Sequence, residues 1–457
     1  MTEPKEKWGS RIGFVLATIG SAVGLGSIWK FPYEVGENGG SGFVLLYLAG
    51  LALIVTPLML AEFAIGRAGG RDARKSMEIL AAAHRAPRSW RAAGTLGVVA
   101  SALILSFYSV VGGWALAYAV ETPFLGLPGS GIDEVNARFD ALLGSPRHLG
   151  VYHTIFMALA AVIVGRGVAA GIESAAKFLM PLLVCLMLAV AAYALAVGDV
   201  SRTLTYLFSF DLARMTPRTV LEAVGLGFFS IGVGLAVMVT YAAYAEKNID
   251  LTAAAVAAIV SDTAISFLAG FAIFPIVFAN GLDPASGPGL MFVTLPLAFS
   301  AMPMGGVVAF AFFALLFVAA LTSAISMLEM PVAFAHSSLG WSRRQAVVVS
   351  ASAIWLAGFL SVFSFNLWRD WFPLSAYPIF ASSTFFDLID YLTSSILLPI
   401  GGLAISIFAG WVLPRALLKE ALGLGDATST ALHVLLRYVV PPTILAVTVA
   451  PLISAGR

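Results

Sequence analysis

The first apolar segment of the chain contains Gly20-Ser21-Ala22-Val23-Gly24-Leu25-Gly26-Ser27, where three glycines interrupt an otherwise hydrophobic run. Each glycine inside a helix costs about 1 kcal/mol relative to alanine. At membrane depth, backbone groups freed by such a break are tolerated only where they line a cavity or are buried in protein. The stretch therefore predicts a broken helix at a binding site.

A second stretch of the same character follows about two hundred residues later. It reads Gly225-Leu226-Gly227-Phe228-Phe229-Ser230-Ile231-Gly232-Val233-Gly234. A pair of interrupted helices at corresponding positions of two halves is the best sequence indicator of a transporter's binding site. We therefore expect the two breaks to meet at one site.

The composition is that of a polytopic membrane protein. Of the 457 residues, 60% are hydrophobic and 11% are charged, whereas soluble domains carry about 25% charged residues. The net charge of +1 and the spread of basic residues over short loops exclude nucleic acid as an expected partner. The single cysteine, Cys185, has no partner for an intrachain disulfide, and we interpret it as a small packing residue.

Runs of about twenty apolar residues predict an all-α fold with about eleven transmembrane helices. The predicted spans are 12–33, 43–66, 94–120, 151–165, 172–197, 219–245, 252–280, 305–335, 345–366, 384–413 and 430–453. Basic residues crowd the segment before the first span and the loop after the second, so the positive-inside rule places the N-terminus in the cytoplasm. We expect a multi-pass protein of the plasma (inner) membrane, with the lipid bilayer as its surroundings.

Two sets of five spans each open with a broken helix, and an odd number per set makes the second set start from the opposite side. This pattern predicts two inverted repeats. The predicted divisions are a cytoplasmic segment at 1–11, a first repeat at 12–197, an extracellular connection at 198–218, a second repeat at 219–413 and an additional helix at 430–453. The apolar segment 290–300 is too short to cross and is expected to pack into an extracellular vestibule. The sequence does not indicate an oligomeric state.

Motifs in nearly all of these spans match one known family. They are Trp8, the Gly20 to Gly26 stretch followed by Phe31-Pro32, Glu37-Asn38-Gly39-Gly40, Glu62, Tyr108, Thr240-Tyr241-Ala242 and Ala319-Ala320-Leu321-Thr322-Ser323. Through them the chain resembles the neurotransmitter:sodium symporters, and among these the bacterial amino-acid transporters. The resemblance implies two five-helix inverted repeats with unwound first and sixth helices, and a transporter in place of an enzyme.

The resemblance also implies where an amino acid binds. The substrate brings a carboxylate and an ammonium into a low-dielectric site, where neither charge can stay unpaired. Freed amides of Leu25 and Gly26 can bind the carboxylate, to which the family's tyrosine, here Tyr108, donates its hydroxyl. Carbonyls near Ala22 and Phe229 can accept from the ammonium.

Two features of the implied site favour neutral amino acids. Position 24 is a glycine, whereas monoamine-carrying relatives have an aspartate there to replace the carboxylate that monoamines lack. The side-chain pocket implied by the resemblance has no charged group. Its wall is formed by Ile104, Tyr108, Phe229, Leu235, Ser323 and Met327. Gly232 and Gly234 add no bulk to the sixth span, so we expect hydrophobic or aromatic L-amino acids.

A hard cation prefers oxygen ligands, and the resemblance implies two such sites. The second sodium site takes the carbonyls of Gly20, Val23 and Ala319 with the hydroxyls of Thr322 and Ser323, and all five residues are present. We expect one or two sodium ions and no organic cofactor.

The first sodium site departs from the family. It uses the Ala22 carbonyl, the substrate carboxylate and the side chains of Ser27, Ser230 and Asp262, although asparagines are usual at positions 27 and 262. An intramembrane carboxylate is by default functional. Asp262 is therefore expected either to pair with this sodium ion or to titrate as a proton is exchanged.

Asp262 also bears on chloride. Chloride-dependent relatives bind the anion with a tyrosine, a glutamine and serines, a pattern matched by Tyr47, Ser230 and Ser266 but not by Leu226. Asp262 lies one helical turn before Ser266, where its charge would repel chloride. We predict a chloride-independent protein.

The gates are the last implication of the resemblance. Lys30 and Asp390 match the outer charge pair, with Tyr108 and Phe229 as an aromatic lid, although arginine is usual at position 30. At the inner gate Lys5 and Trp8 are present. The position that would carry the inner acid is Ser337, so another contact must close that side.

The sequence as a whole predicts a sodium-coupled amino-acid symporter that works by alternating access. Two alternatives keep the same binding residues, namely a non-transporting amino-acid sensor and a proton-coupled amino-acid transporter. A channel is disfavoured because no stripe of polar residues recurs along one face of a span.

Overall fold

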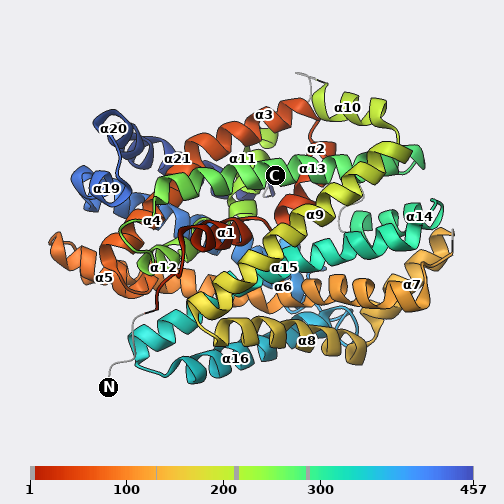
Figure 1. Cartoon of the computed structure of the whole chain (residues 1–457), viewed down its shortest axis with the longest axis horizontal. Helices are drawn as coiled ribbons and strands as arrows, with labels where there is room; N and C mark the ends of the chain where they lie inside the picture. Colours follow the sequence, from red (N-terminus) through yellow and green to blue (C-terminus); the bar gives the residue numbers. More distant parts are fainter. Residues whose placement is uncertain (1–5, 130, 210–215, 285–288, 456–457) are drawn as a thin grey trace.

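The computed structural model describes residues 6–129, 131–209, 216–284 and 289–455. This part of the chain is a bundle of helices (Figure 1). Nine of the described helical segments are long and apolar enough to cross a membrane. They are Ser41–Gly69, Arg88–Leu125, Pro146–Gly165, Val168–Val197, Leu251–Ala279, Gly305–Leu339, Arg343–Ser364, Phe385–Val412 and Asp426–Val449. Each corresponds to one of the predicted spans.

The remaining two predicted spans are the broken ones. Arg11–Ala22 and Gly26–Gly36 are bent by 60° at the break between them and together make a tenth span. The other is divided into α11 (Pro217–Ile231) and α12 (Val237–Ala243), which are separated by Gly232 to Ala236. The predicted all-α fold with unwound first and sixth spans is therefore confirmed.

The helices up to the second break are α1 (Arg11–Ala22), η1 (Gly26–Lys30), α2 (Phe31–Glu37), α3 (Ser41–Gly50), η2 (Leu51–Val55), α4 (Thr56–Gly69), α5 (Ala73–Ala83), η3 (Arg88–Trp90), α6 (Arg91–Leu125), α7 (Ile132–Gly144), α8 (Pro146–Gly165), η4 (Val168–Glu173), α9 (Ser174–Val197) and α10 (Val200–Phe208). After α12 come α13 (Leu251–Ala279), η6 (Leu290–Thr294), α14 (Leu295–Ser300), α15 (Gly305–Leu339), α16 (Arg343–Ser364), η7 (Pro378–Phe380), α17 (Phe385–Asp390), η8 (Tyr391–Leu397), α18 (Leu398–Ile407), η9 (Phe408–Val412), α19 (Arg415–Leu422), α20 (Asp426–Val434), η10 (Leu435–Val439) and α21 (Val440–Ala455). The residue limits of the two predicted repeats stay predictions.

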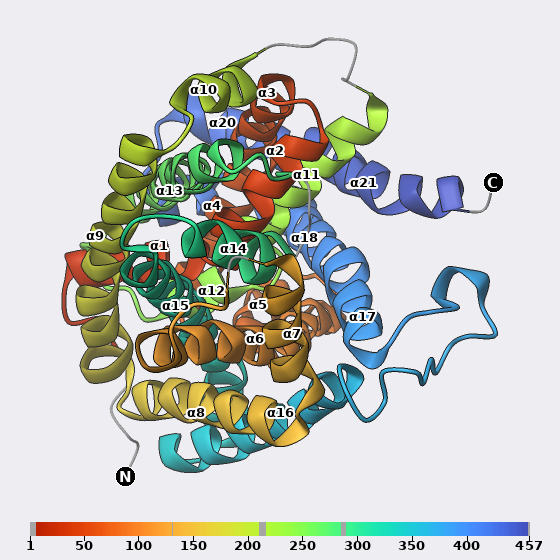
Figure 2. The same ribbon diagram turned by 90° about the vertical axis from the view of Figure 1, so that its right-hand side faces the viewer.

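The connections gather at two ends of the bundle. In Figure 1, α5, α19 and α20 lie at one end, and α7, α10 and α14 lie at the other. Figure 2 shows α8 and α16 side by side at the edge of the bundle. The segment formed by η6 and α14 does not cross, as predicted, and Tyr118 Oη donates to the Phe292 carbonyl in it at 3.1 Å.

The breaks have local causes. Val23 leaves the helical conformation at φ −78° and ψ 110°, and its N–H makes the last α1 bond, to the Ile19 carbonyl at 2.7 Å. Gly232 ends α11 in the left-handed conformation, at φ +70°, which glycine adopts without steric cost. The carbonyl ends of α1 and α11 are thereby freed inside the bundle.

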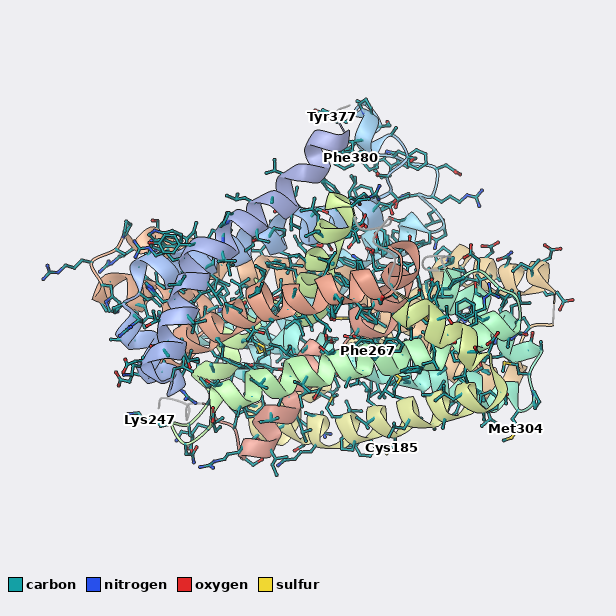
Figure 3. All side chains as sticks on the ribbon, turned by 90° about the horizontal axis from the view of Figure 1, so that it is seen from above. Cys185, Lys247, Phe267, Met304, Tyr377 and Phe380 are labelled. Carbon is teal, nitrogen blue, oxygen red and sulfur yellow. The ribbon has the colours of Figure 1, made fainter. Side chains whose placement is uncertain are left out.

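One packing prediction is wrong. Cys185 is exposed, and Figure 3 shows it on the outer side of α9, not packed in the interior. The reason is that the faces of a transmembrane helix toward lipid and toward protein are both apolar, so hydrophobicity around a cysteine does not tell them apart.

Candidate functional site

A cavity of about 60 Å³ lies where the two breaks meet. Its lining comes from the α1 break, α6, the α11 break, α15 and α18. The lining residues are Ser21, Gly24, Leu25, Gly26, Ile104, Tyr108, Phe229, Ser230, Ile231, Gly232, Leu235, Val237, Ser323, Met327 and Leu398. Of the predicted substrate residues, only Ala22 is absent from this lining. Ser21, Ile231, Val237 and Leu398 were not indicated by the sequence.

One wall of the cavity carries the hydrogen-bonding groups expected to meet a carboxylate. The amide of Leu25 donates to Tyr108 Oη at 3.3 Å, although these residues are 83 positions apart. Both are buried. A backbone donor from the α1 break and a phenol from α6 therefore converge at one point of the cavity.

Glycine is required by the space around position 24. A Cβ atom added to Gly24 would lie 2.8 Å from Ser323 Oγ and 3.2 Å from Tyr108 Oη. The same test at Gly26 places a Cβ 3.1 Å from the Ser230 Cα atom, which belongs to the other broken helix. The glycines thus let the two breaks and α15 approach one another closely.

Apart from three serines the rest of the wall is apolar, and none of the described residues that line the cavity is charged. Gly232 belongs to this wall, whereas Gly234 does not. A Cβ atom on Gly234 would lie 2.6 Å from the Leu398 carbonyl oxygen, and its φ is +94°. The expectation that Gly234 leaves room for a substrate is therefore wrong, because the space beside it is filled by the backbone of α18.

The five oxygen ligands predicted for the second sodium site lie together between α1 and α15. Ser323 Oγ donates to the carbonyls of Val23 at 3.2 Å and Gly20 at 3.4 Å. Thr322 Oγ1 lies 3.0 Å from the Ala319 carbonyl. These carbonyl and hydroxyl oxygens are neutral and of the kind that a hard cation prefers, so the donor set fits sodium.

The residues predicted for the first sodium site form a buried cluster around Asp262. Ser27 Oγ donates to Asp262 Oδ1, and Ser230 Oγ lies 3.1 Å from both carboxylate oxygens. Tyr47 Oη donates to Asp262 Oδ2 at 3.1 Å. Three hydroxyls from α11, η1 and α3 thus surround the carboxylate. Hydrogen bonds to an ionised acceptor are about twice as strong as neutral ones.

Glu62 supports the site from a position that the sequence marked without a role. It is fully buried in α4. Its carboxylate accepts from the amides of Gly234 at 2.7 Å and Met238 at 3.2 Å, which lie on either side of Ala236, a non-glycine residue at φ +57°. A buried carboxylate on α4 therefore holds the unwound part of the sixth span.

The predicted outer ion pair is not formed. The Lys30 ammonium lies 4.8 Å from the centre of the Phe229 ring, and Asp390 accepts from Ser394 Oγ at 2.8 Å. A lysine is a compact charge without the two-pronged geometry that fixes arginine on a carboxylate. Its attraction to an aromatic face then competes with the pairing.

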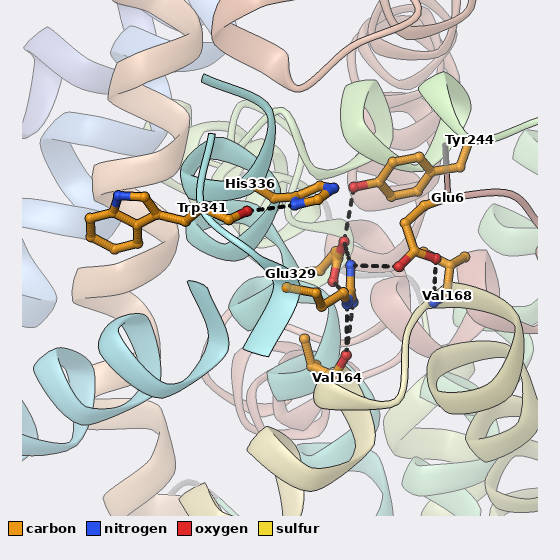
Figure 4. A network of polar contacts seen from close by, with 8 residues as sticks. Glu6, Val164, Val168, Tyr244, Glu329, His336 and Trp341 are labelled. Carbon is orange, nitrogen blue, oxygen red and sulfur yellow. Dashed lines mark hydrogen bonds and ion pairs between the residues drawn. The ribbon is translucent and has the colours of Figure 1, made fainter. Parts of the chain in front are cut away.

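The side where the inner gate is predicted is held together by contacts that the sequence did not indicate (Figure 4). Arg343 Nη2 lies 2.6 Å from Glu329 Oε2, and Arg343 Nη1 lies 3.4 Å from Glu6 Oε1. The Val164 carbonyl accepts from the same guanidinium, and Tyr244 Oη donates to Glu329 at 2.9 Å. This network joins the N-terminal segment to α8, α15 and α16. The lone carboxylate Glu329 inside an apolar span was the available signal.

Further contacts fix the N-terminal segment. Trp8 Nε1 donates to the Tyr241 carbonyl at 2.9 Å, and Ser10 Oγ donates to Glu173 at 2.7 Å. Lys5, the other residue predicted for the inner gate, lies outside the described residues. Ser337 carries no charge, and the ion pairs that tie the N-terminal segment to α15 and α16 are those of Glu6, Arg343 and Glu329.

Comparisons with known proteins agree on the family. A model described as the sodium:neurotransmitter symporter family matches residues 5–134 and 143–368. The chain is 36% identical over 453 residues to an uncharacterised sodium-dependent transporter of Bacillus subtilis, with 98% of each chain covered. It is 26% identical over 380 residues to the sodium-dependent dopamine transporter of Bos taurus, which covers 72% of this chain and 53% of that one.

A solved structure is similar over nearly the whole length. The crystal structure of MhsT in complex with L-phenylalanine superposes with a TM-score of 0.88 at 40% sequence identity. The match covers 98% of this chain and 100% of that chain.

Proposed function

This chain belongs to the sodium:neurotransmitter symporter family of sodium-dependent membrane transporters, and we propose that it couples sodium entry to the uptake of neutral L-amino acids with hydrophobic or aromatic side chains. Transport proceeds by alternating access across the plasma (inner) membrane, with the N-terminus in the cytoplasm.

The observation that carries the proposal is the meeting of the Leu25 amide and the Tyr108 hydroxyl, 3.3 Å apart, beside Gly24. The carboxylate of an amino acid is bound at this point, where the amide end of η1 adds favourable polarity. The ammonium lies toward the freed carbonyls near Ala22 and Phe229, at the negative ends of α1 and α11.

The side-chain preference follows from the apolar wall. Ile104, Leu235 and Met327 present only hydrocarbon and thioether groups, and a charged substrate side chain would lose its hydration there without a partner. The presence of L-phenylalanine in the MhsT structure, at 40% identity to this chain, supports an aromatic or large apolar substrate.

Sodium binds at one or both oxygen clusters, and no organic cofactor is needed. The set of Gly20, Val23, Ala319, Thr322 and Ser323 supplies neutral oxygens only. The Asp262 cluster, which is the first sodium site, supplies a carboxylate. This carboxylate either neutralises a sodium ion bound there or takes up and releases a proton. Gly20 and Val23 belong to the same break as Leu25. Sodium bound at the second site, which includes Gly20 and Val23, therefore stabilises the conformation in which the backbone amides of the break face the substrate.

The test is uptake of labelled leucine, phenylalanine and glutamate into proteoliposomes with an inward gradient of sodium or of potassium. We expect accumulation of leucine and phenylalanine that requires sodium, and competition by unlabelled tryptophan but not glutamate. Binding without accumulation would support the alternative of a sensor. Accumulation that follows a pH gradient and ignores sodium would support a proton-coupled transporter instead.

Uptake is expected to be unchanged when gluconate replaces chloride. Asp262 already accepts from Tyr47 and Ser230, the hydroxyls that match the anion-binding pattern. Two unit charges 4 Å apart repel by about 4 kcal/mol at an effective dielectric constant of 20, so chloride and the carboxylate exclude each other. A several-fold loss of uptake in gluconate would contradict this account, and Asp262→Asn is the matched variant in which chloride should begin to stimulate uptake.

A further inference from the structure

The segment that joins α4 to α6 carries an excess of positive charge. Between residues 67 and 91 there are seven arginine or lysine residues and two acidic ones, a balance of +5, whereas the whole chain has a net charge of +1. One of the two acids, Asp72, caps α5 by accepting from the Arg74 and Lys75 amides. The other, Glu78, lies 3.6 Å from Arg91. Most of these positive charges therefore have no carboxylate partner in the described part of the chain.

A groove of about 650 Å³ opens beside this basic segment, between α5 and the start of α6. Its lining residues are Arg74, Ser89, Arg91, Ala92, Thr95, Leu96 and Val99. Arg74, Arg91, Ser89 and Thr95 contribute its cationic and hydroxyl groups. Its apolar residues recur along α6 at intervals of three and four, which places them on one helix face. Val99 is 46% exposed.

A second groove of about 420 Å³ adjoins the first along the same helix. It is lined by Ser89, Trp90, Ala92, Ala93, Leu96, Ile400 and Ala404. The two grooves share Ser89, Ala92 and Leu96, so they are continuous, and Val99 in the first and Ile400 and Ala404 in the second extend them as two apolar arms. Ile400 in the second arm is 45% exposed, and both arms therefore open onto the apolar surface of the bundle.

The part of the first groove lined by Arg74 and Arg91 suits an anion. The Arg91 side chain is 50% exposed, and Arg74 is held 5.9 Å from the Phe334 ring, with no carboxylate paired to it among the described residues. The 35-residue helix α6 starts here without a side-chain cap, which adds the positive end of its dipole. Trp90 packs against Phe408 at 5.2 Å, and tryptophan is enriched at membrane interfaces.

We propose that these two grooves form a binding site for one anionic diacyl phospholipid. Its phosphate lies between Arg74 and Arg91, near the hydroxyls of Ser89 and Thr95, and each acyl chain occupies one groove. The occupant is assigned by charge complementarity at Arg74 and Arg91 and by the two apolar arms. A free phosphate would leave those arms unused. Basic pockets between transmembrane helices are a known form of lipid headgroup site. The site is separate from the cavity at the helix breaks and does not depend on the transport proposal.

The experiment titrates the purified full-length chain with phosphatidylglycerol or with phosphatidylcholine of the same acyl chains and counts bound lipid by native mass spectrometry. We expect phosphatidylglycerol to bind more tightly. An arginine near anionic lipid contributes about fivefold in affinity, so Arg74→Gln with Arg91→Gln should weaken phosphatidylglycerol by about 25-fold and leave phosphatidylcholine unchanged. The charge-keeping pair Arg74→Lys and Arg91→Lys should retain the preference.

The matched control is Arg85→Gln with Arg88→Gln, which removes the same charge from the same segment outside both grooves and should cost much less. Single-chain lysophosphatidylglycerol should bind more weakly than the diacyl lipid, and millimolar inorganic phosphate should not compete. The proposal is overturned if both lipids bind equally or if inorganic phosphate displaces the lipid. It is equally overturned if the glutamine pair at Arg74 and Arg91 and the glutamine pair at Arg85 and Arg88 lose the same affinity. It is also overturned if Leu96→Trp, at a residue that lines both grooves, leaves lipid binding intact.

Discussion

Replacing Glu62 by glutamine is expected to reduce sodium-driven amino-acid uptake by at least about a hundredfold. The carboxylate accepts from the amides of Gly234 at 2.7 Å and Met238 at 3.2 Å, and it holds the unwound segment between α11 and α12. Each hydrogen bond to a buried charge contributes about 1.5–3 kcal/mol, and each 1.4 kcal/mol is tenfold in rate. A glutamine side chain keeps one acceptor oxygen. Its amide group is a donor and would face a backbone amide that is also a donor, so that hydrogen bond is lost.

The measurement is the initial rate of uptake together with the dissociation constant of the substrate. Both should worsen, because the segment that Glu62 holds carries Gly232 and Leu235 of the cavity wall. The matched control is Glu222→Gln in α11, whose partner Arg218 is largely exposed and which should transport at close to the normal rate. Uptake by the Glu62 variant within a few-fold of wild type would show that the break does not need its carboxylate.

Replacing Gly24 by aspartate is expected to weaken amino-acid binding by about a thousandfold. The new Cβ atom would lie 2.8 Å from Ser323 Oγ and 3.2 Å from Tyr108 Oη, so the cavity would have to widen. The new carboxylate would also face the carboxylate of the substrate, and charges about 4 Å apart repel by about 4 kcal/mol at an effective dielectric constant of 20. For an amine without a carboxylate, the same substitution should reduce the binding affinity far less.

Binding of phenylalanine and of phenethylamine to the Gly24→Asp protein separates the two effects. A steric effect alone would weaken both ligands, whereas charge repulsion weakens phenylalanine selectively. Gly24→Ala measures the steric part. The control is Gly425→Asp, at a position where an added Cβ meets no atom within 4 Å. If Gly24→Asp binds phenylalanine like the wild type, the substrate is not bound where we propose.

The membrane fold and the location of the site could be predicted from the sequence because their causes are local. Helices break at the glycine stretches through backbone propensity, which acts within a few residues, and span lengths follow from bilayer thickness. The oxygen donors of the candidate sodium sites could be named through the family resemblance, and the structure brings Ser323 to Gly20 and Val23 over a separation of about 300 residues.

The remaining features were decided by tertiary structure, because each depends on which distant segments pack together. The sequence shows that Glu62 and Glu329 are carboxylates in apolar spans, but their partners lie on other helices, at Gly234 and Arg343. The Lys30 ammonium lies over the Phe229 ring and not beside Asp390, an outcome set by the relative positions of η1, α11 and α17. Gly234 faces the backbone of α18, although its sequence context resembles that of Gly232. Local propensity shows where a helix ends, and only packing shows what the freed groups then meet.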